Sequence, residues 1–199
     1  MSPIAKRLNR LAPFICALAV SVLCQPASGF DDDAKDRVID IAGGKFKLTA
    51  PESWERKKPK VNIIEHEFEA PASKRDKRPG RVTVMGAGGS VEENIERWYG
   101  QFKQPDGSAT EDSAKVEKMT IAGQEVHLVD VTGTFLDKPP FAAGRAIERE
   151  DYRLLGAIIV TKQKDKPTGN YFVKLVGPNQ TLSDHEEAFR EMIEGLSVN

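Results

Sequence analysis

Cysteine is nearly absent from this sequence, and its absence removes several kinds of chemistry. Only Cys16 and Cys24 occur among the 199 residues, and both lie in the apolar stretch near the N-terminus. If that stretch is removed, the remaining chain has no disulfide, no thiolate metal site and no cysteine nucleophile. None of the three histidines has a second histidine or a cysteine at the spacing of a metal site. We therefore expect no metal and no cofactor.

Signatures of catalysis and of nucleotide binding are missing as well. No G-x-S-x-G motif of a serine nucleophile occurs. Val91 stands where the dinucleotide fingerprint needs its third glycine, and no Gly-Lys-Ser/Thr of a phosphate-binding loop follows the glycines at 86–89. Acidic residues are plentiful, but one sequence does not show which two converge, so a catalytic pair of carboxylates stays open. The sequence names no catalytic residue and favours a protein that is not an enzyme.

The only long apolar run lies at the N-terminus. Three basic residues within the first ten precede an apolar run over residues 11–24, and small residues follow up to Gly29. This order is typical of a secretory signal peptide, and about 14 apolar residues are few for a membrane span. We expect residues 1–29 to be a signal peptide, residues 30–37 to be an acidic tether, and the protein to be exported to the periplasm or the cell exterior. A retained membrane anchor and a lipid anchor at Cys24 are less favoured alternatives.

An excess of positive charge is also lacking. The whole chain has 29 basic and 30 acidic residues. Without residues 1–29 it keeps 26 basic against 30 acidic residues, a net charge of −4. This balance argues against a nucleic-acid partner. Membrane contact is expected only transiently, through the signal peptide.

The stretch from Arg81 to Lys103 is the part with the strongest pattern. Residues 81–85 alternate as a half-buried strand, and a glycine turn follows. Ser90 is expected to cap a helix, with Glu93 closing a capping box. Four apolar residues then fall on one helical face over residues 91–102. The pattern predicts a strand, a turn and a helix over residues 90–103 that packs one face on the core.

The rest of the chain predicts several hairpins and one more helix. Glycine turns at 43–44 and 122–123 separate pairs of short strands, and residues 61–70, 152–162 and 171–176 also read as strands. Ser183 and Glu186 are expected to form a second capping box before a closing helix. Consecutive hairpins imply antiparallel pairing, and two amphipathic helices must each bury a face. We therefore expect one α+β domain over residues 38–199, with an antiparallel β-sheet and helices packed against it.

The chain resembles a group of exported bacterial proteins with a PsbP-like domain. The resemblance covers roughly residues 38–197 and is carried by motifs in the helix and in the strands around it. These are the Pro51…Trp54 turn, Gly88-Gly89-Ser90 with Asn94–Trp98 and Gly100–Phe102, Ile121-x-Gly123, Val129-Asp130-x-x-Gly133, Tyr152–Ala157 and Tyr171–Pro178. The resemblance implies the αβα sandwich of the PsbP subunit of photosystem II and of the Mog-type Ran-binding protein. Because those relatives bind and assemble, it also implies a non-enzymatic module.

Two regions are candidates for binding. The first is a small-ligand or enzymatic pocket beside the helix at 90–103, where the glycine turn could hold an anion on free amides or be only a tight turn with a cap. Its residues would be Gly89, Ser90, Asn94, Arg97, Trp98 and Gln101. The second is a partner-binding loop within a long connection from Asp137 to Asp151. Its residues would be Pro139, Pro140, Phe141, Arg145 and Arg149.

Two basic loops offer a third surface. They carry Arg56, Lys57, Lys58 and Lys60 in one loop and Lys74, Arg75, Lys77, Arg78 and Arg81 in or beside the other. If the loops meet, they could engage an envelope protein or an anionic surface. Solvated loops are the simpler reading. The favoured hypothesis is an exported binding or assembly module of the cell envelope, and the alternative is the pocket beside the helix.

Overall fold

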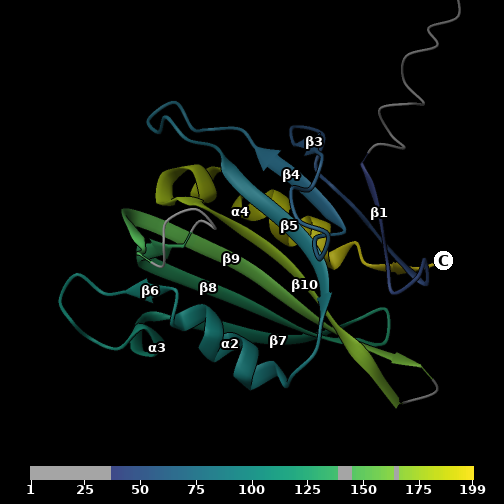
Figure 1. Cartoon of the computed structure of the whole chain (residues 1–199). Helices are drawn as coiled ribbons and strands as arrows, with labels where there is room; N and C mark the ends of the chain where they lie inside the picture. The colour runs from purple at the N-terminus through teal and green to yellow at the C-terminus, as the bar shows by residue number, and fades with distance from the viewer. Residues whose placement is uncertain (1–36, 139–144, 164–165) are drawn as a thin grey trace, which may run out of the picture.

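The fold is built on one large antiparallel sheet, and the expected α+β class is confirmed (Figure 1). The computed structural model describes residues 37–138, 145–163 and 166–199. The expected signal peptide and nearly all of the expected tether lie outside these residues. In spatial order the strands of the large sheet are β3 (Glu55–Lys57), β4 (His66–Ala70), β5 (Gly80–Ala87), β10 (Lys166–Pro178), β9 (Ile147–Gln163), β8 (Gln124–Asp137) and β6 (Phe102–Lys103). The strand β7 (Lys115–Ile121) pairs with the first half of β8.

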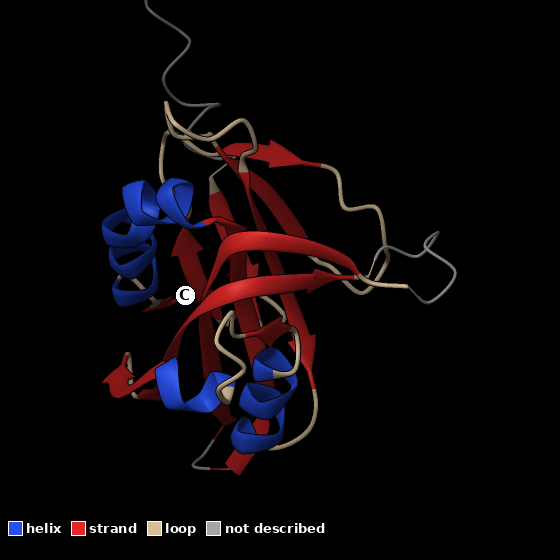
Figure 2. Ribbon diagram, turned by 90° about the vertical axis from the view of Figure 1, so that its left-hand side faces the viewer, coloured by secondary structure: helices blue, strands red, loops and turns tan. Residues whose placement is uncertain are grey.

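Helices lie on both faces of this sheet (Figure 2). The helix α4 (Asn179–Glu194) packs on one face together with a small sheet of β1 (Val38–Ile41), β2 (Phe46–Thr49) and β11 (Ser197–Val198). The helix α2 (Val91–Tyr99) packs on the other face near β6 and β8, followed in the chain by the short α3 (Thr110–Ser113). Because strand side chains alternate, each strand serves both faces. No helix in the described part of the chain is long and apolar enough to cross a bilayer.

The core is divided by the sheet into two clusters. On the α4 side, Trp54, Phe68, Leu182 and Phe189 belong to the larger cluster. On the α2 side, Trp98 belongs to a cluster with side chains from β8, β9 and β10. This division matches the alternation of apolar residues in the sequence, in which neighbouring residues of one strand supply opposite clusters.

The helix after the glycine turn is confirmed in kind and corrected in length. Ser90 accepts from the Glu93 amide and the Glu93 carboxylate accepts from the Ser90 amide, as the capping box predicts. The helix ends at Tyr99, however, and Phe102 is in β6, paired with Phe135 of β8. Phe102 continues the helical spacing of apolar residues, but it is buried as a residue of β6, because the helix ends before Gly100.

The closing helix begins earlier than expected. It starts at Asn179 behind Pro178, so Ser183 and Glu186 are inside it and form no capping box. The hydroxyl of Ser183 donates to the Asn179 carbonyl, and Glu186 pairs with Arg153 at 2.8 Å. Pro178 is the last residue of β10 and has an extended backbone, so the helix follows the strand directly and includes Ser183.

Two of the expected segments also change shape. Of residues 61–70, only His66–Ala70 forms a strand. The long connection after β8 is shorter than expected, because β8 continues to Asp137 and β9 begins at Ile147. Arg149 is therefore a strand residue. The expected tip of this connection, Pro139, Pro140 and Phe141, lies outside the described residues.

Candidate binding site

The sheet has a pocket on its α2-side face, and no residue of α2 lines it. Its volume is about 380 Å³. We call it the sheet-face pocket. It is lined by Arg78 and Pro79, by Arg81 and Thr83 of β5, by Lys174, Val176 and Gly177 of β10, by Tyr152 and Arg149 of β9 and by Phe135 and Asp137 of β8. Residues of four neighbouring strands and of the loop before β5 therefore meet there.

An irregularity in β9 brings two of these residues to the pocket. Gly133 is opposite Tyr152 and Phe135 is opposite Arg149, so two steps along β8 match three steps along β9. The extra residue is accommodated by a bulge in which Asp151 has a φ of 52°. In a regular strand, residues three apart point to opposite faces. Because of the bulge, Arg149 and Tyr152 both line the sheet-face pocket.

The loop before β5 is held in place by α4. The Asp76 carboxylate accepts from the amide and from the hydroxyl of Thr181, both at 2.7 Å. The hydroxyl oxygen of Thr181 also accepts from the Ser73 amide at 3.1 Å and lies 3.4 Å from the Arg78 carbonyl. Asp76 thus satisfies an amide in the first turn of α4, where helices have no internal acceptor. The same contacts fix the backbone that carries Arg78 to the pocket.

Four cationic side chains and one carboxylate line the pocket. Two of the cations are paired. Arg81 donates through Nε and NH2 to the buried Glu67 at 2.9 and 3.1 Å, and Arg149 contacts Asp137 at 2.9 and 2.8 Å. These pairs hold the guanidinium groups in place. Arg78 and Lys174 have no carboxylate partner among the described residues, so the pocket carries a local excess of positive charge.

Lys174 is the central cation of the pocket. It stands on β10 between Phe172 and Val176, partly buried, and its ammonium group donates to the Oε1 atom of Gln101. Its Nζ atom lies 6.0 Å from the centre of the Trp98 ring. Burial, and then the charge of Arg81, lower the pKa of Lys174 to about 8 from its usual 10.5. At neutral pH the group is still mostly charged, but its charge is poorly compensated.

Two aromatic side chains, Phe135 and Tyr152, also line the pocket. The rings of Phe135 and Tyr152 are parallel within 5°, with centroids 6.1 Å apart, and Phe102 packs behind Phe135 at 5.3 Å. Val176 adds an apolar side chain from β10. The pocket therefore combines cationic side chains with an apolar surface formed by Phe135, Tyr152 and Val176. Figure 2 shows how the strands near this end curl out of the sheet.

Most residues of the first expected site have structural contacts. Asn94 is fully buried, donates to the carbonyls of Gly88 and Ser90, and accepts from Arg97 at 2.5 Å. Trp98 is buried against Phe172, with ring centroids 5.6 Å apart. Gln101 accepts a hydrogen bond from Lys174, a lining residue of the sheet-face pocket, and the Trp98 ring lies near the same lysine. A ligand role for these residues stays a prediction.

Two amides at the start of α2 already have side-chain acceptors. The capping box occupies the amides of Ser90 and Glu93, and Asn170 donates to the Gly89 carbonyl at 2.9 Å. The two hydrogen bonds from Ser90 lower the pKa of Glu93, so a carboxylate sits where an anion would bind. This geometry favours the simpler reading of a tight turn with a cap, in which Gly89 supplies a φ of 91°.

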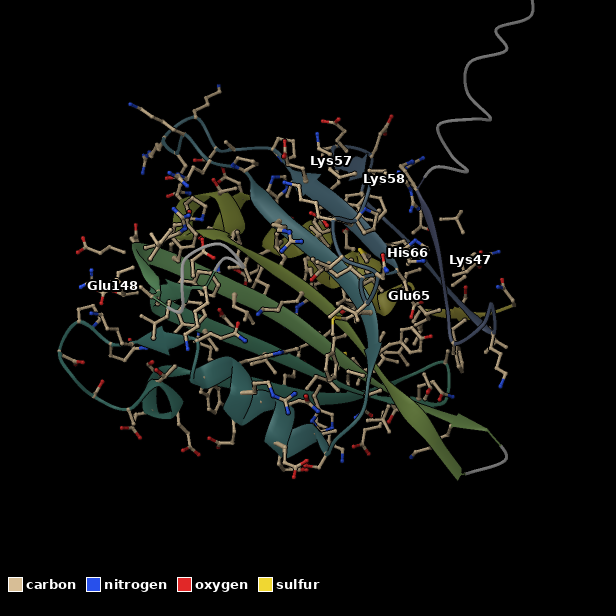
Figure 3. All side chains as sticks on the ribbon, viewed as in Figure 1. Lys47, Lys57, Lys58, Glu65, His66 and Glu148 are labelled. Atoms are coloured by element: carbon tan, nitrogen blue, oxygen red, sulfur yellow. The ribbon has the colours of Figure 1, made fainter. Side chains whose placement is uncertain are left out.

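The two basic loops do not meet, because they leave β4 at opposite ends. Figure 3 shows Lys57 and Lys58 beside His66, across the molecule from Glu148 of β9. Lys57 pairs with Glu55 at 2.7 Å, and Arg56 donates to the Val38 carbonyl at 2.6 Å. The second loop instead meets the strand that carries Arg149, at the sheet-face pocket. Arg145, from the same expected partner loop, is exposed.

The histidines have structural roles. His185 accepts from the Trp54 indole at 3.2 Å and lies 2.9 Å from the Pro71 carbonyl. His66 contacts Arg56 at 3.0 Å, and His127 contacts Glu125 at 2.8 Å. Within residues 37–138, 145–163 and 166–199, no three side chains of His, Cys, Asp or Glu gather closely enough to hold a metal ion.

The sequence analysis named three residues that line the pocket, Arg78, Arg81 and Arg149, but it missed Lys174. Lys174 is a lone charge within the apolar run at 171–176, and such a charge on an inward-facing strand position is a signal that could have been read. Tyr152 and Thr83 also escaped notice. No local pattern shows that the bulge at Asp151 places Tyr152 beside Arg149.

No protein-family model matches the chain, and no curated protein matches it. Its structure is similar to the solution structure of cyanobacterial PsbP (CyanoP) from Synechocystis sp. PCC 6803, with 10% identity, a TM-score of 0.47, and coverage of 81% of this chain and 91% of that one. The PsbP-like resemblance of the sequence agrees with this similarity.

Two further solved structures are similar to the chain. One is LpqN of Mycobacterium tuberculosis, a protein involved in cell envelope biogenesis, with 10% identity, a TM-score of 0.46, and coverage of 88% of this chain and 99% of that one. The other is a protein of Bacteroides thetaiotaomicron, with 12% identity, a TM-score of 0.41, and coverage of 82% of this chain and 48% of that one. At such identities the similarities concern the fold alone.

Proposed function

We propose that the chain is an exported, non-enzymatic binding module of the cell envelope, and that its binding site is the sheet-face pocket, which takes an anion. One observation carries the binding site: Lys174 lies partly buried in a pocket with three arginines and has no carboxylate partner among the described residues. The exported location rests on the order of residues 1–29, which lie outside the described part of the chain.

Several features support an anionic ligand. Burying a charge is unfavourable unless an opposite charge accompanies it, and a bound anion would supply that charge to Lys174. The bidentate contact of Arg81 with Glu67 leaves further N–H groups of the guanidinium for a second acceptor. The pocket volume of about 380 Å³ is that of a small-molecule site.

The alternative of an enzyme has less support at this pocket. Asp137 is its one carboxylate among the described lining residues, and Arg149 is paired with it. A pair of carboxylates for acid–base catalysis is therefore not assembled there. Binding without chemistry is the simpler function for these side chains.

The experiment is a titration of the purified, isotope-labelled protein with inorganic phosphate, followed by nuclear magnetic resonance. We expect saturable shifts in the amides around Thr83, Lys174 and Tyr152, and an affinity at least tenfold weaker in Lys174→Met. Lys118→Met is the matched control. Lys118 is on the edge strand β7, is paired with Glu125 of β8 and does not line the pocket. Shifts scattered over the surface, or unchanged binding in Lys174→Met, would contradict the proposal.

A further inference from the structure

The lining of the sheet-face pocket indicates more than the charge of its ligand. It combines the cations Arg78, Arg81, Arg149 and Lys174 with the apolar side chains of Phe135, Tyr152 and Val176. A free inorganic anion would pair only with the cations. The apolar side chains would then stay in contact with water, although the two rings are stacked and Phe102 packs against Phe135.

The available charge sets a limit on the ligand. Glu67 already compensates Arg81, and Asp137 already compensates Arg149. Of the four cations that line the pocket, Arg78 and Lys174 are those without a carboxylate partner among the described residues. A ligand with one phosphate monoester group or with two carboxylates matches two positive charges, whereas a polyanion would leave several negative charges unmatched.

We infer that the ligand is an amphipathic anion, in which a phosphate or carboxylate group contacts Lys174 and an attached apolar or flat body packs against Tyr152 and Phe135. This inference rests on the proposed function and names the ligand class of the same site. The geometry of the bulge agrees with it, since the bulge turns Tyr152 and Arg149 to the same side. One residue of this pair supplies the aromatic surface and the other anchors Asp137 at the rim.

The test compares phenyl phosphate with inorganic phosphate in calorimetric titrations of the purified protein. Phenyl phosphate is expected to bind at least tenfold more tightly. Tyr152→Ser should reduce its affinity to that of inorganic phosphate, while Lys174→Met weakens both probes. Tyr99→Ser is the control, since Tyr99 is an aromatic residue on α2 that does not line the pocket.

The outcomes separate this inference from the proposed function. Equal affinities for the two probes, unchanged by Tyr152→Ser, would overturn the amphipathic ligand and leave the anion site standing. No binding of either probe would overturn both. Because Tyr152→Ser can disturb folding, benzyl alcohol with the unaltered protein provides a second measurement, and tighter binding of this neutral probe than of phenyl phosphate would also overturn the inference.

A further arm identifies the source of the ligand. Vesicles of phosphatidylcholine with phosphatidic acid present the same chemistry on a lipid. Co-sedimentation that requires both Lys174 and Tyr152 supports a lipid source, and binding of phenyl phosphate without co-sedimentation supports a free small molecule. Co-sedimentation that is equal in the unaltered protein and both variants, together with equal affinities for the two phosphates, would contradict the inference.

Discussion

The indole of Trp98 packs directly on the α-carbon of Gly156. A Cβ atom built on Gly156 would lie 2.3 Å from Cζ3 of the indole, far inside contact distance. This contact joins α2 to the middle of β9 and brings the helix close enough for Gln101 to reach Lys174. The contact between Gln101 and Lys174 beside the pocket thus depends on the absence of a side chain at position 156.

The first prediction concerns this contact. Gly156→Ala should lower the free energy of unfolding by about 1–3 kcal/mol, because the added methyl group must displace a buried ring in a packed core. Urea unfolding measures the change. Gly88→Ala is the control, since no atom lies within 4 Å of its built Cβ and its φ is not positive. Equal effects of the two substitutions would contradict the packing argument.

The second prediction concerns the pH dependence of stability. The pKa of Lys174 is lowered to about 8 in the folded protein, so between pH 8 and 10.5 the unfolded chain binds more protons and stability gains with rising pH. Lys174→Met should therefore raise the free energy of unfolding by about 1–3 kcal/mol at pH 7. The advantage should disappear above pH 10.5. A variant less stable than the parent at pH 7 would show that the lysine is well compensated.

The third prediction compares two residues near the start of α4. Asp76→Ala should lower the free energy of unfolding by about 1–2 kcal/mol, because it removes the acceptor of the Thr181 amide. Ser183→Ala should change it by less than about 0.5 kcal/mol, because Ser183 is inside the helix and bonds back to Asn179. Thermal or urea unfolding of both variants decides between this cap and the one that the sequence motif suggests.

The fourth prediction concerns acid. Hydrogen bonds from His127 and then Lys118 lower the pKa of Glu125 to about 2 from its usual 4.5. The stabilisation is present above pH 4.5 and is lost as the pH falls toward 2. Glu125→Gln should lower the free energy of unfolding by about 0.5–1 kcal/mol at pH 6, a modest value because the site is partly exposed. The difference from the parent should vanish near pH 2, as followed by circular dichroism.

The predictable parts of the fold are those set by neighbours in the sequence. The Ser90–Glu93 capping box, the β1–β2 and β7–β8 hairpins and the alternation in β5 depend on contacts within a few residues, and all of them are present. They can be predicted because the residues that form them lie close together in the sequence.

The parts that escaped prediction depend on distant residues. Asp76 caps a helix more than a hundred residues away, and β10 inserts between β5 and β9. The candidate site was equally hard to predict, because Lys174, Arg81 and Tyr152 are on separate strands. Only pairing register, which the sequence does not state, places their side chains on one face.

Because of the bulge at Asp151, the pocket depends on the pairing register of β8 and β9 as well as on the residue types that line it. A relative could keep the arginine and the tyrosine at this spacing but lack the bulge, and a regular ladder would then send them to opposite sides of the sheet. Alignments that score residue types would rate such a relative as equivalent. The bulge opposite Gly133 and Phe135 is therefore the feature that would distinguish chains with this pocket from chains that share only the fold.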